Sequence, residues 1–524
     1  MKLFYNNNIF KNNFFFVLII SLFSFFINFY YSKFGAFPID TFLHYDSAFR
    51  ILNNEYPVRD YWIVSGFIVD FIQSIFFKLF GVNWFAYIFH SSLFNLIISI
   101  FTYYFCLSLK INRLNSFIYT LSFATLAYTI SGTPFVDHHA SFFLLISTYL
   151  IIHALNFPKK NYLWVFIVIL FFFSFLSKQV PFAYVVISQS TILLYLFIKN
   201  KNFDIIKIIL ISITILILLF LFFLNYLNIN FNDFYHQYIA YPLNIGTNRY
   251  GSLNNSIESL FNQYKFLILP ITIISIIKLK KIKNKELNFS STEFINFLII
   301  LALCTSLIFH QISTRNQIYI YFLIPICFAL LETNIKDSNV KLKKYFSFSI
   351  IIFVLFITLK YHFRYNETRK FHELENVNLK DAVLASKIDK SLNGLFWINP
   401  IYKDEPKKET IILNEAKIRL EKIENNIMFF TNYLFLDTIT KKKMNNPNKH
   451  FTLDGVSFPM KGNKLYHYYE NFLKNKIKSK NIKKIYFFKH EKISHKIITK
   501  YFSINCYNFT EEDLFYVYEI KCLN

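Results

Sequence analysis

Ionisable residues gather in one short polar segment that follows the first hydrophobic run of the chain. Carboxylates, a histidine and arginines lie between residues 38 and 62, at Asp40, His44, Asp46, Arg50, Glu55, Arg59 and Asp60. Ionisable groups beside a bilayer are costly unless they perform or support chemistry. The segment is therefore the first candidate for a reaction site.

A positioned carboxylate can act here as a general base. A hydroxyl or amine becomes a better nucleophile when a carboxylate accepts its proton during attack. Asp46 is the first candidate for this role and Asp40 the second. Because Asp46 precedes Arg50 by four residues, the alternative is an ordinary ion pair on a helix surface. Asp60 beside Arg59 is interpreted as an orienting pair rather than a base, and both residues are placed among the substrate-binding candidates.

The composition of the rest of the chain predicts an integral membrane protein. Of 524 residues, 54% are hydrophobic and only 17% are charged. A helix needs about 20 apolar residues to cross a bilayer. Uncharged runs predict about eleven spans, at residues 11–33, 84–109, 114–134, 138–157, 161–177, 180–198, 206–228, 264–278, 293–311, 316–331 and 345–360.

The basic residues between these runs predict the topology. With a cytoplasmic N-terminus, the inner loops near residues 110–113, 159–160, 199–207, 278–285 and 336–344 are all short and basic. Cytoplasmic loops of membrane proteins carry such an excess of lysine and arginine. We therefore expect residues 1–360 to form a transmembrane domain, with residues 33–83 as its first outer loop. An odd number of spans leaves residues 361–524 outside.

Residues 361–524 have the character of a small α/β domain. Strand-length runs at 426–431 and 485–488 alternate with helix-like stretches at 464–477 and 491–502, an order typical of mixed folds. The Lys- and Asn-rich stretch 441–448 is expected to be a surface loop. Cys506 and Cys522 could form a disulfide, whereas Cys106, Cys304 and Cys327 fall in predicted spans and are expected to be packing residues.

Residues 65–81 predict a helix that lies in the membrane interface. Apolar residues recur there at helical spacing, and Asp70, Ser74 and Lys78 share the opposite face. The net charge of +24 is divided between the inner loops and the C-terminal domain. A basic face of that domain could meet anionic headgroups, and nucleic acid is not expected as a partner on the outer side of a membrane.

This layout resembles the GT-C superfamily of membrane glycosyltransferases. The resemblance rests on the loop with Asp46, the segment Tyr56-Pro57-Val58-Arg59-Asp60-Tyr61, Gly66, the interfacial helix and Leu79-Phe80-Gly81. It is greatest to the branch of protein O-mannosyltransferase-like and aminoarabinose-transferase-like enzymes, and residues 176–179 are also similar to a segment of bacterial members. Two features differ: the usual acidic pair is Asp46-Ser47, and His-Pro-Pro-Leu is replaced by residues 64–67, Val-Ser-Gly-Phe.

The resemblance implies transfer of a sugar from a polyprenyl-phosphate donor to an envelope glycan, lipid or protein. The acceptor side would be the outer face of a bacterial inner membrane, with the C-terminal domain periplasmic and a first-loop carboxylate acting at the acceptor. A lipid-phosphate leaving group develops negative charge, which cations stabilise in a poorly solvated site. Lys178, His310 and Arg315 fall at predicted outer ends of spans and could converge there with the acidic loop. The alternative for each is an anchor that reaches lipid headgroups.

The Asp137-His138-His139 segment could bind the acceptor or a metal ion. Adjacent residues of a helix point in different directions, so we place only His138 among the substrate-binding candidates and assign no metal ligand. A divalent ion such as Mg²⁺ or Mn²⁺ could still serve as a cofactor.

Two other functional classes are compatible with a polytopic chain. A transporter or flippase of lipid-linked sugars would be expected to show paired halves or spans broken by glycine and proline, and the chain has only nine glycines. A non-catalytic membrane scaffold would not need the acidic loop. The sequence does not support nucleotide-dependent chemistry, because it has no Walker-type loop, no dinucleotide fingerprint and no Asp-x-Asp.

Overall fold

The computed structural model describes residues 7–34, 38–250, 257–314, 320–335, 340–368, 374, 377–423, 426–451, 456–491 and 493–522. The chain forms two compact units, each assembled from three separate segments. Unit 1 contains Met1–Ser32, Ile88–Leu218 and Leu253–Glu375, and unit 2 contains Lys33–Tyr87, Leu219–Ser252 and Asn376–Asn524.

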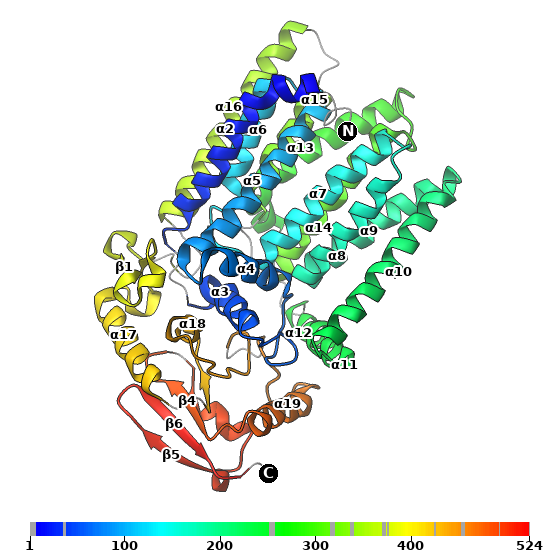
Figure 1. Cartoon of the computed structure of the whole chain (residues 1–524). Helices are drawn as coiled ribbons and strands as arrows, with labels where there is room; N and C mark the ends of the chain where they lie inside the picture. The colour runs from blue at the N-terminus through cyan, green and yellow to red at the C-terminus, as the bar shows by residue number, and fades with distance from the viewer. Residues whose placement is uncertain are drawn as a thin grey trace. The chain divides into compact units, whose positions relative to one another are not determined.

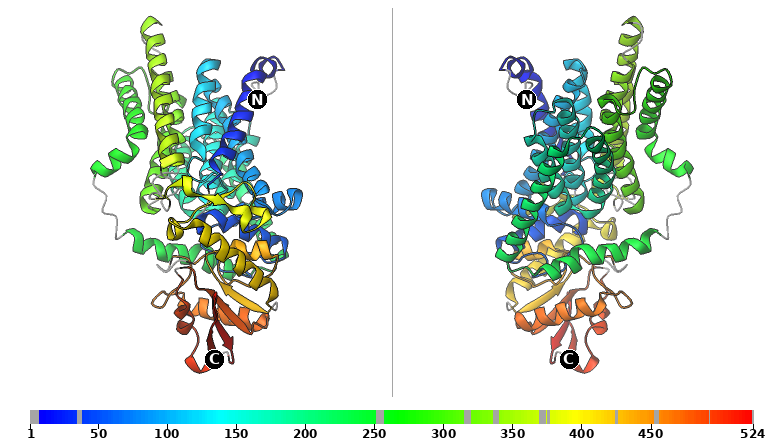
Figure 2. Two further views of the ribbon diagram at one scale, coloured as in Figure 1. Left: turned by 90° about the vertical axis from the view of Figure 1, so that its left-hand side faces the viewer. Right: turned by 90° about the vertical axis from the view of Figure 1, so that its right-hand side faces the viewer.

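Unit 1 is a bundle of long apolar helices that run roughly parallel to one another (Figures 1 and 2). Its helices are α2 (Asn7–Tyr31), α5 (Trp84–Ser108), α6 (Arg113–Ala127), α7 (Val136–Asn156), α8 (Tyr162–Ser177), α9 (Gln179–Lys199), α10 (Phe203–Tyr226), α13 (Ile257–Lys283), α14 (Thr292–Thr314), α15 (Leu323–Asn334) and α16 (Val340–His362). Among the described residues, eight helices are long and apolar enough to cross a membrane, and α8 and α15 are shorter apolar helices. The protein is therefore a polytopic helical protein. The figure of eleven spans stays a prediction.

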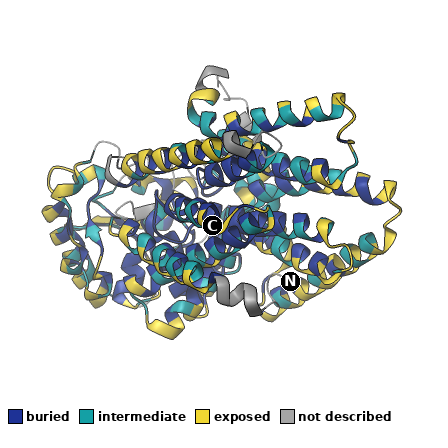
Figure 3. Cartoon of the chain, turned by 90° about the horizontal axis from the view of Figure 1, so that it is seen from above, coloured by how far each residue is buried: buried dark blue, intermediate teal, exposed yellow. Residues whose placement is uncertain are grey.

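The bundle has polar contacts at positions where its helices approach closely. The amide of Asn28 on α2 donates to Ser91 Oγ at 2.9 Å and to the Gly132 carbonyl at 3.0 Å, as buried amides do between membrane helices. Gly132 has φ +67°, and a Cβ there would lie 2.4 Å from the backbone nitrogen of Ser32. Only glycine fits this position. Figure 3 shows buried and exposed residues alternating along several helices, which therefore have an inner and an outer face, whereas α7 is buried over most of its length.

Unit 2 combines short helices with two small sheets. Its helices are α3 (Pro38–Leu52), α4 (Ile68–Phe80), α11 (Phe231–Phe234), η1 (Tyr235–Ala240), α12 (Tyr241–Tyr250), α17 (Pro406–Lys422), α18 (Phe435–Thr440) and α19 (Tyr466–Ser479), beside several short 3₁₀ turns. Strands β1 (Val383–Leu384) and β2 (Phe396–Trp397) pair antiparallel. The main sheet contains β3 (Ile427–Phe430), β4 (Lys484–Phe488), β5 (Tyr507–Glu511) and β6 (Phe515–Ile520) in the order β3-β4-β6-β5 (Figure 1).

The main sheet confirms a small C-terminal sheet domain. Strand β3 runs parallel to β4, with Phe430 opposite Phe487, and the other neighbouring pairs are antiparallel. Helix α19 connects β3 to β4 along the chain and buries Leu473 and Ile477 in the same core as these strands. Trp62 from the first polar loop is fully buried in this core.

Two details of the C-terminal prediction are wrong, and one open question is answered. Of the described residues in 491–502, only His495–Lys500 are helical, and they form a 3₁₀ helix that buries Ile497 and Ile498 in the core. The predicted surface loop 441–448 is buried from residue 444 onward, because its backbone hydrogen-bonds interior groups such as the Trp62 amide. Cys506 and Cys522 form a disulfide.

Candidate functional site

The acidic loop folds into helix α3, which carries both predicted base candidates. Proline is favoured in the first turn of a helix, and α3 begins at Pro38 with Asp40 in its first turn and Arg50 in its last. These charges also complement the helix dipole. Asp40 is half-buried, whereas Asp46 and Arg50 are 1% and 2% exposed.

Asp46 contacts Arg50 but does not receive its hydrogen bonds. Arg50 Nη1 lies 3.9 Å from Asp46 Oδ2, so the i,i+4 contact of the alternative interpretation is present. The guanidinium donates instead from Nε to Glu55 at 3.0 Å and from Nη2 to the Asn446 carbonyl at 2.7 Å, and lies over the Tyr61 ring. Asp46 Oδ1 has no hydrogen-bond partner in the described part of the chain. Asp46 is therefore a buried carboxyl with one oxygen that can accept a further hydrogen bond.

A second buried carboxyl from the C-terminal part of the chain is electrostatically coupled to Asp46. Asp437 lies on α18, which packs against α3, and is 2% exposed. Burial raises the pKa of Asp46 to about 7, Arg50 opposes this shift and Glu55 adds to it. Burial and the charge of Asp46 raise the pKa of Asp437 well above its ordinary range. Of the two buried carboxyls, Asp437 is therefore the one that keeps its proton to higher pH.

Sequence reasoning missed Asp437. The available signal was an aspartate within the otherwise apolar run Tyr433–Ile439. An unpaired carboxylate is costly in such a setting, so its presence there indicates a specific role.

Asp70 on α4 holds a second buried polar cluster in unit 2. Its Oδ1 lies 2.5 Å from His44 Nδ1, and its Oδ2 accepts from Lys449 Nζ at 2.5 Å. Lys449 also donates to the Gly66 carbonyl at 3.1 Å. All three ionisable side chains are at most 1% exposed. The cluster therefore connects α3, α4 and the buried loop after residue 443.

Helix α4 has the amphipathic pattern predicted for residues 65–81, with two of the three polar-face residues turned inward and the third, Lys78, exposed. Asp70 and Ser74 are buried, whereas Ile75 and Leu79 are 57% and 67% exposed. An exposed apolar face is the arrangement expected of a helix that lies in a membrane interface.

The Asp70 cluster yields a stability prediction. Removing one partner of a buried ion pair leaves an uncompensated charge and typically costs about 3–5 kcal/mol. We expect Asp70→Asn to lower the unfolding temperature clearly, because Lys449 loses its counter-charge. Thermal unfolding of the purified protein in one detergent measures this. The matched control is Glu405→Gln, which removes the exposed pair with Lys408 and should have a small effect; equal effects of both variants would contradict the prediction.

Arg59 and Asp60 form the predicted orienting pair. Arg59 Nε donates to Asp60 Oδ2 at 2.8 Å, and the Tyr56 amide donates to the same oxygen at 2.8 Å. Burial opposes ionisation of Asp60, but these two donors lower its pKa overall. Arg59 also donates to the carbonyls of Asn54 and Leu227. The pair therefore fixes the turn after α3.

Lys476 on α19, which the sequence interpretation did not single out, supports the same region. It donates to the backbone carbonyls of Asp60 and Asn446 and is 6% exposed. Burial, and then repulsion from Arg50, lowers the pKa of Lys476 to about 7.

Unit 1 brings two of the predicted phosphate-binding residues together. Lys178, between α8 and α9, donates to both carboxylate oxygens of Asp137 at 2.8 and 2.7 Å. His310 Nε2 lies 3.5 Å from Asp137 Oδ1. Lys178 is therefore held by a buried carboxylate rather than extended toward headgroups. His138 instead stacks on Tyr128, with 4.7 Å between ring centroids.

The structure does not test whether the predicted site residues line one shared pocket. Arg315 lies outside the described residues. Asp40 and Asp46 belong to unit 2, whereas Lys178 and His310 belong to unit 1. A pocket lined jointly by these residues stays a prediction.

The residues do not fit a metal centre. Within the described ranges, no three His, Cys, Asp or Glu side chains are placed to hold a metal ion together. The carboxylate of Asp137 already binds Lys178 in bidentate fashion, which occupies the oxygens that a metal would need.

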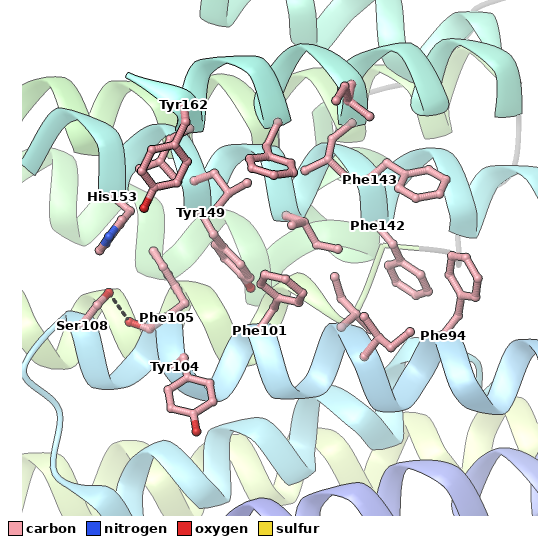
Figure 4. A pocket seen from close by; sticks show the side chains of 18 residues that line it. Phe94, Phe101, Tyr104, Phe105, Ser108, Phe142, Phe143, Tyr149, His153 and Tyr162 are labelled. Carbon is pink, nitrogen blue, oxygen red and sulfur yellow. Dashed lines mark hydrogen bonds between the residues drawn. The ribbon is translucent and has the colours of Figure 1, made fainter. Parts of the chain in front are cut away.

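An apolar pocket of about 530 Å³ lies among α5, α7 and α8 in unit 1. Figure 4 shows its aromatic lining, with Phe94, Phe142 and Phe143 in one part and Ser108, His153 and Tyr162 in another. Asp137 and Lys178 lie on or beside two of the same helices, α7 and α8. The pocket is suited to a hydrocarbon chain.

Two comparisons with known sequences found no relative of this chain. No family model matches the sequence, and the search of curated proteins returned no match.

Proposed function

We propose that the protein is a membrane glycosyltransferase of GT-C type that uses a polyprenyl-phosphate sugar donor. The observation that carries the proposal is the pair of buried carboxyls, Asp46 and Asp437, with the pKa of Asp46 raised to about 7 by burial. A general base is most effective when its pKa lies near the working pH. Neither a scaffold nor a helix-surface ion pair needs two carboxyls in this arrangement.

In the proposed reaction, ionised Asp46 accepts the proton of an acceptor hydroxyl or amine as that group attacks the anomeric carbon. A new glycosidic bond forms, the bond from the anomeric carbon to the phosphate oxygen breaks, and the polyprenyl phosphate leaves with the electron pair. Asp437, which stays protonated because burial and Asp46 raise its pKa, would donate a hydrogen bond to Asp46. Arg50 would limit the ionisation cost of Asp46 without taking its proton-accepting oxygen.

The donor side of the proposal rests on unit 1. Lys178 and His310 would stabilise the negative charge that develops on the leaving phosphate. The apolar pocket among α5, α7 and α8 would hold part of the isoprenoid chain. The acceptor would be a glycan, lipid or protein of the cell envelope.

The direct test is transfer by the full-length protein in lipid nanodiscs. Radiolabelled sugar on polyprenyl phosphate is added with a membrane extract as the acceptor source, and labelled product is separated from donor. Protein-dependent release of polyprenyl phosphate together with labelled product supports the proposal. Movement of intact donor between leaflets of a proteoliposome without sugar transfer would indicate a flippase instead.

We also propose that the protein lies in a bacterial inner membrane with a cytoplasmic N-terminus and a periplasmic C-terminal domain. The basic inner loops support this topology. Asn284 and Asn508 are both exposed, and a cysteine at each position is expected to be labelled from opposite sides of the membrane. An impermeant maleimide should label Asn508→Cys in intact spheroplasts and Asn284→Cys only after lysis. The three natural free cysteines are buried, and labelling of both variants from one side would reject the topology.

A further inference from the structure

A polar pocket of about 400 Å³ in unit 2 is separate from the Asp46 cluster. Three segments distant in sequence line it: the turn after α3, the start of α11 and one face of α19. Its volume falls within the range of small-ligand sites. The lining contains aromatic, amide, hydroxyl and charged side chains, among them Arg59, Asp233, Tyr468, Asn471, Asn475 and Lys480.

The charged groups of this pocket are largely engaged with one another. Asp60 accepts from Arg59 and lies 3.6 Å from Lys480 Nζ. Asp233 accepts a hydrogen bond from the Tyr468 hydroxyl. Because opposite charges within the lining offset each other, the pocket is poorly suited to recruiting a free ion.

The remaining groups match a neutral sugar. The Asn471 and Asn475 side chains are exposed on α19, one turn apart on the same face. An amide offers both a donor and an acceptor, which suits the vicinal hydroxyls of a sugar ring. Phe472 packs edge-on against Trp62, with 5.9 Å between the ring centroids. It adds an apolar surface on which the C–H face of a sugar ring can pack.

We infer that this pocket binds one neutral sugar unit of a glycan. Arg59 and Asp60, in the turn after α3, line the pocket. Lys476 donates to the carbonyls of Asp60 and Asn446, and the Asn446 carbonyl also accepts a hydrogen bond from Arg50. Under the proposed function, on which this assignment of a role rests, the bound unit belongs to the acceptor glycan. Sugar binding itself does not require transfer.

Saturation-transfer NMR on the full-length protein in nanodiscs tests the inference. The probes are the methyl glycosides of glucose, galactose, mannose and N-acetylglucosamine, with inorganic phosphate and glucuronate as competitors. We expect at least one neutral glycoside to bind, and its Kd to rise at least tenfold in the double variant Asn471→Ala with Asn475→Ala. The matched control, Asn508→Ala, changes an exposed asparagine on β5 outside the pocket and should bind normally.

The other outcomes would decide against the pocket assignment or against the proposed function. Binding of none of the four glycosides, or unchanged binding by the double variant, would overturn it. A saturation-transfer signal from glucuronate that phosphate displaces, without any neutral-sugar signal, would identify an anion site instead. Normal sugar binding by a protein that transfers no sugar would reject the proposed function and leave the pocket assignment standing.

Discussion

Replacing Asp46 with asparagine is expected to lower single-turnover sugar transfer by about 100- to 10,000-fold, the usual contribution of a general base. The amide keeps the shape of the carboxyl but cannot accept the acceptor's proton. The measurement is transfer from a polyprenyl-phosphate donor in nanodiscs at saturating donor. Asp40→Asn is tested beside it, because Asp40 is the second candidate on the same helix.

The fold is expected to tolerate Asp46→Asn. A carboxyl whose pKa is raised by folding favours its protonated form, so ionisation of Asp46 lowers stability as the pH rises from about 4 to about 7. The amide removes that cost, and the variant should unfold at the same temperature as the wild type or slightly above it at pH 8. A helix-surface pair with Arg50 would instead be worth about 0.5 kcal/mol or less and leave turnover alone.

The pH dependence of the wild-type rate provides an independent check. Asp46 must be ionised to accept a proton, so the rate should rise as the pH increases through about 7. We expect Asp437→Leu to move this rise to higher pH, because it removes the protonated carboxyl that, in the proposed mechanism, donates a hydrogen bond to ionised Asp46. A wild-type rate that is constant between about pH 6 and pH 8, or full activity in Asp46→Asn, would remove Asp46 from the mechanism. Loss of activity in Asp40→Asn, together with normal activity in Asp46→Asn, would identify Asp40 as the base.

Local patterns in the sequence predict the helices well because their signals are local. The apolar period of residues 65–81 depends on residues within a few turns. The same holds for the strand-length runs that become β3 and β4. If the apolar face of helix α4 meets a bilayer, the helical period of residues 65–81 places Asp70 and Ser74 on the inner face.

The sequence predicts only those residues of the candidate site that lie on helix α3. The other residues of the site belong to the C-terminal part of the chain. Asp46 and Arg50 share one helix, but Asp437, Asn446 and Lys476 come from segments about 400 residues later. The polar composition of residues 441–448 is typical of a surface loop. Nothing local indicates that the Asn446 carbonyl accepts hydrogen bonds from two buried side chains, Arg50 and Lys476. Pairings at such sequence separation carry no periodic signal.

Replacing Lys178 is the second change with a large expected effect. We expect Lys178→Met to slow transfer by about 100- to 1,000-fold, the usual loss when one preorganised group that stabilises transition-state charge is removed. That variant alone also leaves Asp137, which is 1% exposed, without its cation, and a buried unpaired charge destabilises a fold by about 3–5 kcal/mol. Low activity in the single variant could therefore come from lost folding.

The double variant Lys178→Met with Asp137→Asn separates the two effects, because it removes the cation and its counter-charge together. It should recover much of the unfolding temperature while transfer stays low, and Lys178→Arg should restore a substantial part of the rate because it keeps the charge. Single-turnover transfer and thermal unfolding are measured on the same preparations. Since the donor phosphate is the proposed partner of Lys178, the double variant should also bind polyprenyl phosphate more weakly than the wild type. Near-normal transfer in the stable double variant would show that Lys178 only neutralises Asp137, and the leaving phosphate would then need another cation.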